Sequence, residues 1–111
     1  MTTPQITDLH EVAGRLLADA QRAASGRAAE TIISGSVQRS TVIALTTDAE
    51  MAEHDSPPAA VVHVISGRVR MHTNDEEWVL GAGQVAPVPS RRHGVQALED
   101  SALLLTVALH G

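Results

Sequence analysis

The sequence has no cysteine, no phenylalanine, no tyrosine and no lysine, and Trp78 is its one aromatic residue. These absences exclude a thiolate nucleophile, a disulfide, a Schiff-base lysine and a tyrosine acid. They also exclude the aromatic platforms on which proteins stack single-stranded nucleic acid. Six histidines, thirteen acidic residues and the hydroxyl groups remain for acid, base or metal chemistry.

The charge balance narrows the choice of partners. The formal net charge is −5, and all eight basic residues are arginine. Nucleic-acid binding depends on clustered positive charge that releases counterions, so we expect no nucleic-acid partner. No apolar run approaches the ~20 residues that span a bilayer, so we expect no membrane segment either. With no cysteine to report on redox compartment, the expected location is the cytoplasm.

The 111 residues suffice for one domain. Residues 1–29 are predicted to form an amphipathic helix and a linker, because apolar residues recur there at steps of three and four. Asp8 and Glu11 are placed to cap the start of this helix, and Gly26 to follow its end. The apolar stripe consists of Leu9, Val12, Ala13, Leu16, Leu17, Ala20, Ala23 and Ala24.

Residues 30–111 are predicted to be all-β. Short runs rich in Val, Ile, Leu and Thr alternate there with turn-forming residues, which favours an antiparallel barrel or jelly roll. The acidic stretch from Asp48 to Asp55 does not match a calcium-binding loop, and we interpret it as a solvated loop. The expected strands are 31–33, 37–45, 61–66, 68–72, 77–80, 84–88, 93–97 and 102–109.

Two motifs and a closing segment resemble those of the small, single-domain cupins of the RmlC-like superfamily. The first motif runs from His54 to Gly67 and continues into Arg68-Val69-Arg70, and the second runs from Gly83 to His93. The segment 97–106 is similar to the closing strand pair of the same family. The resemblance implies a cupin-type antiparallel β-barrel (jelly roll), preceded here by one N-terminal α-helix.

The resemblance also implies a metal site with part of its ligand set missing. Metal-binding cupins present two histidines and a glutamate from the first motif and one histidine from the second. His54 and His93 match two of these positions, whereas Ser56 and Ala60 stand at the other two. The implied cofactor is one divalent transition metal, Fe, Mn, Ni or Zn, held by His54 and His93.

Such metals need at least three protein ligands. Glu50, Glu53 and Asp55 are the candidates for a carboxylate ligand, because all three lie near His54 in the sequence. Strand alternation argues against Glu53 and Asp55, since each would point away from the side to which His54 points.

Alternation also predicts a mostly apolar pocket. It places Val62 and Val64 inside the barrel, and Val69 and Met71 as well. We therefore predict Val62 and Met71 as ligand-binding residues. We add Arg91, which lies two residues before His93 and would bring a guanidinium to the pocket rim to hold a carboxylate or phosphate. The alternatives are that Met71 only fills the core, and that Arg91 is a surface residue paired with acids such as Glu53 or Asp55.

Three functions remain open at this point. The first is a small-molecule-binding protein, in its enzymatic form with His54 and His93 as catalytic residues and with the metal. The second is metal-free acid–base catalysis by the same histidines, as an isomerase, lyase or cyclase, because imidazole exchanges protons near neutral pH. The third is a non-catalytic ligand sensor or structural module. A homodimer is expected in each case, through an apolar outer face of the barrel.

Overall fold

One helix precedes a run of short strands in the computed structural model, which describes residues 4–54 and 57–110, without the side chains of Glu53 and His54. The predicted all-β fold with an N-terminal helix is confirmed. The elements are α1 (Leu9–Arg22), β1 (Arg27–Ser34), β2 (Gln38–Leu45), β3 (Glu50–His54), β4 (Ala60–Ser66), β5 (Arg68–His72), β6 (Glu77–Gly81), β7 (Val85–Pro87), β8 (His93–Ala97) and β9 (Ser101–Ala108). No helix in the described part of the chain has the length and apolar character to cross a membrane.

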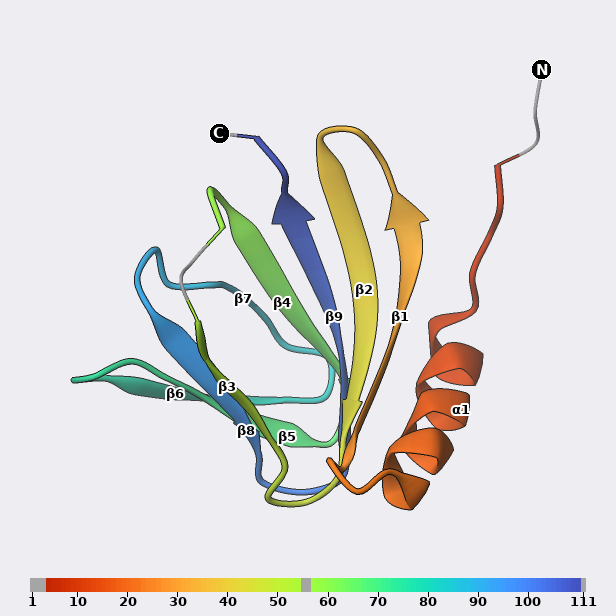
Figure 1. Cartoon of the computed structure of the whole chain (residues 1–111), viewed down its shortest axis with the longest axis horizontal. Coiled ribbons are helices and arrows are strands. Elements are labelled where there is room, and N and C mark those ends of the chain that lie inside the picture. The colour runs from red at the N-terminus through yellow and green to blue at the C-terminus, as the bar shows by residue number, and fades with distance from the viewer. Residues whose placement is uncertain (1–3, 55–56, 111) are drawn as a thin grey trace.

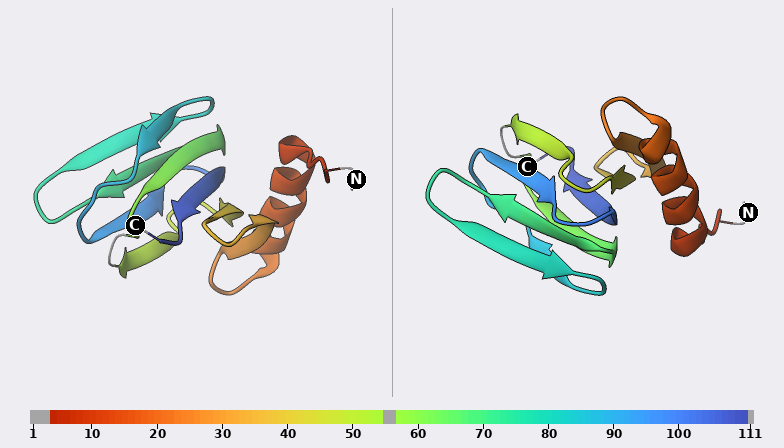
Figure 2. Two further views of the ribbon diagram at one scale, coloured as in Figure 1. Left: turned by 90° about the horizontal axis from the view of Figure 1, so that it is seen from above. Right: turned by 90° about the horizontal axis from the view of Figure 1, so that it is seen from below.

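The strands form two antiparallel sheets that face each other (Figure 1). The larger sheet has the order β1-β2-β9-β4-β7 and the smaller one β3-β8-β5-β6. Among the described residues no strand pairing joins the two sheets, so the expected barrel takes the form of a two-sheet sandwich. The sheets lie close together at one end and diverge at the other, and α1 lies against the larger sheet on its outer side (Figures 1 and 2).

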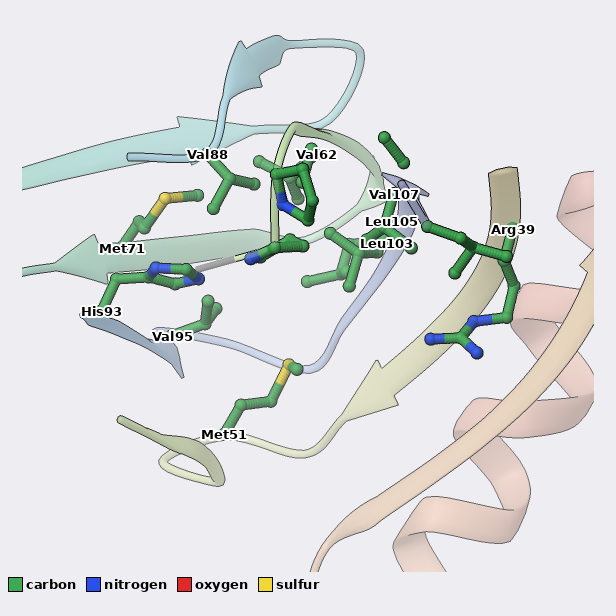
Figure 3. Close-up of a pocket in the computed structure, with 15 residues that line it drawn as sticks. Arg39, Met51, Val62, Met71, Val88, His93, Val95, Leu103, Leu105 and Val107 are labelled. Carbon is green, nitrogen blue, oxygen red and sulfur yellow. The ribbon is translucent and has the colours of Figure 1, made fainter. Parts of the chain in front are cut away.

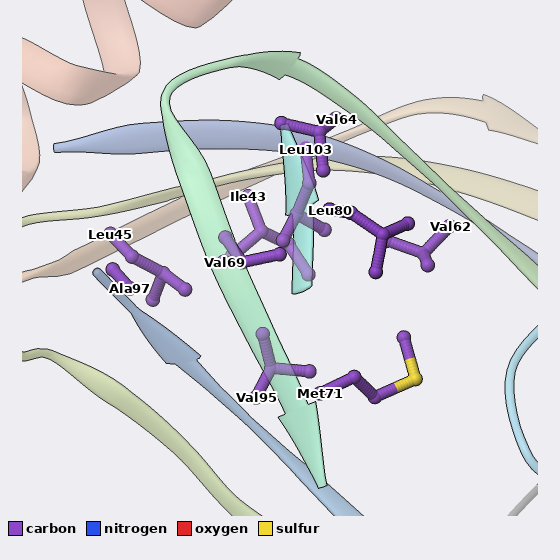
Figure 4. Close-up of a cluster of buried hydrophobic side chains, with 10 residues drawn as sticks. All are labelled: Ile43, Leu45, Val62, Val64, Val69, Met71, Leu80, Val95, Ala97 and Leu103. Carbon is purple, nitrogen blue, oxygen red and sulfur yellow. The ribbon is translucent and has the colours of Figure 1, made fainter. Parts of the chain in front are cut away.

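The core between the sheets is aliphatic apart from one thioether (Figure 4). Successive residues of a strand point to opposite faces, and the burial pattern follows that rule. In β4, Val62 and Val64 are buried whereas Val61 is exposed, as predicted. The core consists of Ile43, Leu45, Val62, Val64 and Leu103 from the larger sheet and Val69, Met71, Leu80, Val95 and Ala97 from the smaller one.

The helix begins where the sequence predicts. The carboxylate of Asp8 accepts hydrogen bonds from the backbone N–H groups of His10 and Glu11, at 3.0 and 3.2 Å. The buried side of the helix packs on the outer face of β2, which forms a second apolar cluster. This cluster contains Val12, Leu16, Ala20, Val42 and Ala44.

Two polar contacts fasten the helix to the sheets. Arg15 Nη1 lies 2.9 Å from Glu30 Oε1, and this hydrogen bond lowers the pKa of Glu30. Gln21 donates to the carboxylate of Asp100 at 3.2 Å. The same carboxylate accepts from the backbone N–H and the hydroxyl of Thr47, at 2.8 and 2.9 Å. The Thr47 N–H is the main reason that the pKa of Asp100 is lowered.

The structure corrects the sequence analysis in two places. The first strand begins at Arg27, directly after Gly26, and not near residue 30. The acidic stretch contains a strand, β3, and not only a solvated loop. This strand is at an edge of the smaller sheet, where Glu50 is exposed and Met51 packs against the core. An edge strand needs only one apolar face, and the other can carry acidic residues. The acidic residues of β3 therefore made this segment resemble a loop in the sequence.

The turn between β4 and β5 requires glycine. Gly67 has a φ of 81°, a region that residues with a Cβ rarely adopt. A Cβ there would also collide with the carbonyl oxygen of Asp100 and the hydroxyl of Ser101. Ser101 is fully buried, and its hydroxyl accepts from the backbone N–H of Arg68 at 2.9 Å. The turn is therefore locked against the start of β9.

We predict that Gly67→Ala destabilises the protein more than Gly83→Ala. Gly83 has a φ of 84°, but a Cβ there meets nothing within 4 Å. Both variants suffer the left-handed backbone strain of roughly 1–2 kcal/mol, and only Gly67→Ala adds a collision. Urea denaturation followed by circular dichroism measures both free energies of unfolding. Equal losses in the two variants would show that the close packing at Gly67 contributes nothing.

Candidate functional site

A cavity of about 420 Å³ opens between the two sheets (Figure 3). Its walls come from both sheets, at the end where they diverge. The volume lies within the range of roughly 300–1,000 Å³ that is usual for small-molecule sites. The lining residues are Arg39, Met51, Pro57, Pro58, Ala60, Val62, Met71, Val88, His93, Val95, Leu103, Leu105, Val107, Ala108 and Leu109.

The cavity wall is apolar except at two places. His93 and Arg39 are the polar residues among those described in its lining. Figure 3 shows them on opposite sides of the cavity, with valine, leucine and methionine side chains between them. This arrangement suits a molecule with an apolar body and polar groups at its ends.

His93 begins β8, and the residue is only 3% exposed. Its Nδ1 lies 2.8 Å from the carbonyl oxygen of Arg91. A carbonyl oxygen only accepts hydrogen bonds, so Nδ1 carries the proton. In the neutral ring the lone pair then lies on Nε2, the nitrogen that accepts a proton, a hydrogen bond or a metal ion.

The backbone of His54 lies opposite His93. The two residues are register partners in the β3–β8 pairing, after a shift in register between Met51 and His54. The two predicted metal-site histidines are thus neighbours on adjacent strands. The side chain of His54 lies outside the described residues, as do the side chain of Glu53 and the whole of Asp55.

The described side chains do not by themselves make up a metal site. None of their His, Cys, Asp and Glu side chains form a group of three that could hold one. His93 is the one such side chain among the described residues lining the cavity. Ala60, at the position where the resemblance implies a glutamate, supplies only a methyl group to the wall. Glu50 is exposed and pairs in register with Gln96.

Two of the three predicted ligand-binding residues line the cavity, and the third does not. Val62 and Met71 both line the cavity with His93. Arg91 is not among the described lining residues, and its guanidinium pairs with Asp75 at 3.1 Å and with Glu76. These two acids precede β6, so Arg91 binds a different part of the chain from the acids near His54 that the sequence suggested.

Arg39 is the cavity residue that sequence reasoning missed. It lies in β2 on the same side as Ile43 and Leu45, which are in the core between the sheets. The signal was present, because residues 39, 43 and 45 have the same parity in a predicted strand. A single arginine near a strand end is more often a surface residue, so the sequence alone does not mark Arg39 as part of a cavity.

Comparison with known proteins finds similar structures, but no similar family model or curated sequence. No family model matches the chain, and no curated protein matches it. A conserved protein of unknown function from Streptococcus pyogenes superimposes with a TM-score of 0.73 at 22% identity, over 97% of this chain and 90% of that one.

Two solved cupins are also similar. A cupin superfamily protein from Desulfitobacterium hafniense has a TM-score of 0.70 at 11% identity, over 75% of this chain and 77% of its own. An RmlC-like cupin from Shewanella frigidimarina has a TM-score of 0.69 at 21% identity, over 77% and 78%. At such identities the likeness concerns the fold alone. The chain therefore has the fold of the small cupin-domain proteins.

Proposed function

We propose that the protein binds a small organic molecule with an apolar body in the cavity between its sheets. The observation that carries this proposal is the cavity of about 420 Å³, whose described lining residues are apolar except for Arg39 and the buried His93. Burial of apolar surface supplies about 25 cal/mol per Å², so such walls favour an apolar ligand. His93 then orients the ligand through Nε2.

The same geometry supports a catalytic form of this function. The hydrogen bond from Nδ1 to the Arg91 carbonyl orients the His93 ring and favours one tautomer. An imidazole held in this way acts as a general base through Nε2. His54, its register partner, is the proposed second proton carrier. The reaction classes remain isomerisation, elimination and cyclisation. A non-catalytic sensor uses the same pocket without turnover.

The metal-dependent form is the weaker version of the proposal. It requires His54 and a third ligand to join His93, and a structural or catalytic zinc site needs three or four protein ligands. The described residues offer His93 alone at the cavity. Our version of the proposal is binding without a resident metal, because it needs only His93 and the apolar wall.

We predict that Ala60→Leu blocks the cavity. The neutral fluorescent probe N-phenyl-1-naphthylamine should bind the wild type, with energy transfer from Trp78 as the signal. Trp78 lines a second hollow that shares Met71 and Val88 with the cavity. The larger side chain should weaken binding about tenfold or more, because it fills the space that the probe occupies.

Ala59→Leu is the matched control. Ala59 precedes Ala60 and is not among the described residues that line the cavity. It lines a more open neighbouring groove, which shares Ala60, Val107 and Ala108 with the cavity wall. This variant should bind the probe as the wild type does. Equal binding by all three proteins would place the probe outside the cavity and refute the proposal.

A second prediction concerns metal content. Protein purified without a metal-affinity tag should contain much less than one equivalent of Fe, Mn, Ni or Zn by elemental analysis, and probe binding should survive a chelator. The metal-dependent form predicts the opposite: about one equivalent of metal, lost in both His54→Ala and His93→Ala. A stoichiometric metal that both substitutions remove would replace our version by that one.

The homodimer is also a proposal, and exposed apolar side chains support it. Val61 on β4 is 45% exposed and Val85 on β7 is 62% exposed. The two strands pair with each other at the edge of the larger sheet, and α1 packs mainly on β1 and β2. A stable interface needs about 800 Å² from each partner.

We predict that the double variant Val61→Glu/Val85→Glu is monomeric while the wild type is dimeric, because charges in an apolar interface lose their hydration. Light scattering coupled to gel filtration gives both masses. Val79→Glu is the control, since Val79 is 53% exposed on β6 of the other sheet and should leave the dimer intact. A monomeric wild type would refute the dimer.

A further inference from the structure

We propose that Arg39 makes the cavity selective for organic carboxylates, so that the ligand is a small amphipathic acid. Its apolar body would lie between the sheets and its carboxylate at the rim. This inference rests on the proposed function, because it specifies the ligand class of the same cavity. The argument depends on where Arg39 lies, what surrounds it and what its side chain binds.

The strand pairing holds Arg39 at the cavity. Arg39 is the register partner of Val107 in the β2–β9 pairing, and Val107 lines the cavity. Two further register pairs follow the same row inward, Thr41 with Leu105 and Ile43 with Leu103. Leu105 also lines the cavity. Arg39 therefore ends an inward row whose other end is in the core.

The guanidinium of Arg39 has no acidic partner in the described part of the chain. The other arginines with ion pairs there, Arg15, Arg22, Arg70 and Arg91, each contact a carboxylate within 4.0 Å. No described lining residue of the cavity is acidic. An exposed charge beside an apolar cavity, with no carboxylate partner among the described residues, is available to a carboxylate of the ligand.

The chemistry of guanidinium specifies the ligand group. Its planar array of N–H donors forms two parallel hydrogen bonds with a carboxylate, and it stays charged throughout the physiological pH range. Figure 3 shows Arg39 across the cavity from His93, with Leu103, Leu105 and Val107 on the intervening wall. A ligand bound by Arg39 at one end thus extends its apolar part toward His93.

The test compares two ligands of the same shape. Octanoate and its neutral counterpart octanamide compete with N-phenyl-1-naphthylamine for the cavity. In the wild type we expect octanoate to compete about fivefold better, the size of a charge pair at an exposed site. Added salt should reduce this preference, because it screens the pair.

Arg39→Gln is the decisive variant and Arg68→Gln its control. Arg68 is exposed, lies at the opposite end of the sandwich beside Gly67, and is not among the cavity residues. Arg39→Gln should bring the two ligands to equal potency while octanamide competes as before. Arg68→Gln removes the same charge and should retain the preference.

The outcomes separate this inference from the function on which it rests. If the probe and octanamide bind but octanoate has no advantage, or if Arg39→Gln keeps it, the carboxylate inference fails and the binding function stands. If neither the probe nor either competitor binds the wild type, both fail. Salt-sensitive octanoate preference that only Arg39→Gln abolishes supports the inference.

Discussion

Strand alternation in two sheets that converge at one end is the constraint on which the rest of the structure depends. Along β2 the inward row runs from Leu45, fully buried, through Ile43 to Arg39 at the open end. One row of side chains therefore supplies first the core and then the cavity (Figures 1 and 3). The core has no phenylalanine or tyrosine, and the short side chains of valine and alanine leave space where the sheets diverge. The cavity follows from the same packing that closes the other end.

The helix α1 covers the apolar outer face of the larger sheet. The outward row of β2 is also apolar, with Val42 and Ala44 fully buried beneath α1. A sheet with two apolar faces needs cover on both, and the smaller sheet covers only one. A helix of 14 residues is marginal alone, so its stability comes from this contact. The contacts of Arg15 with Glu30 and of Gln21 with Asp100 then fix its position along the sheet.

The sequence predicted those features that depend on local pattern. The capped helix at Asp8 and the burial of Val62 follow from periodicity, and the structure confirms both. Pairing between segments that are distant in the sequence was harder to predict. Nothing local tells that Arg91 pairs with Asp75, because that contact depends on the loop conformation between β7 and β8. The acid-rich strand β3 was hidden for a related reason: its pairing with β8, and not its composition, makes it a strand.

Different parts of the cavity determine the affinity for a ligand and the selectivity among ligands. Its apolar walls provide most of the binding free energy, because apolar burial scales with area and most of the described lining residues are apolar. The polar groups provide little net energy: Arg39 is exposed, and His93 already uses one nitrogen to bond the Arg91 carbonyl. Their separation instead sets the orientation of the ligand, since a ligand bound the other way round would place its apolar end at Arg39 and its carboxylate at His93, where the lone pair on Nε2 offers no hydrogen-bond donor. Burying an unpaired carboxylate costs far more than the rim contact contributes. Selectivity for the orientation thus comes mainly from the buried end at His93, which offers a carboxylate no donor, and Arg39 determines which charge is accepted at the rim.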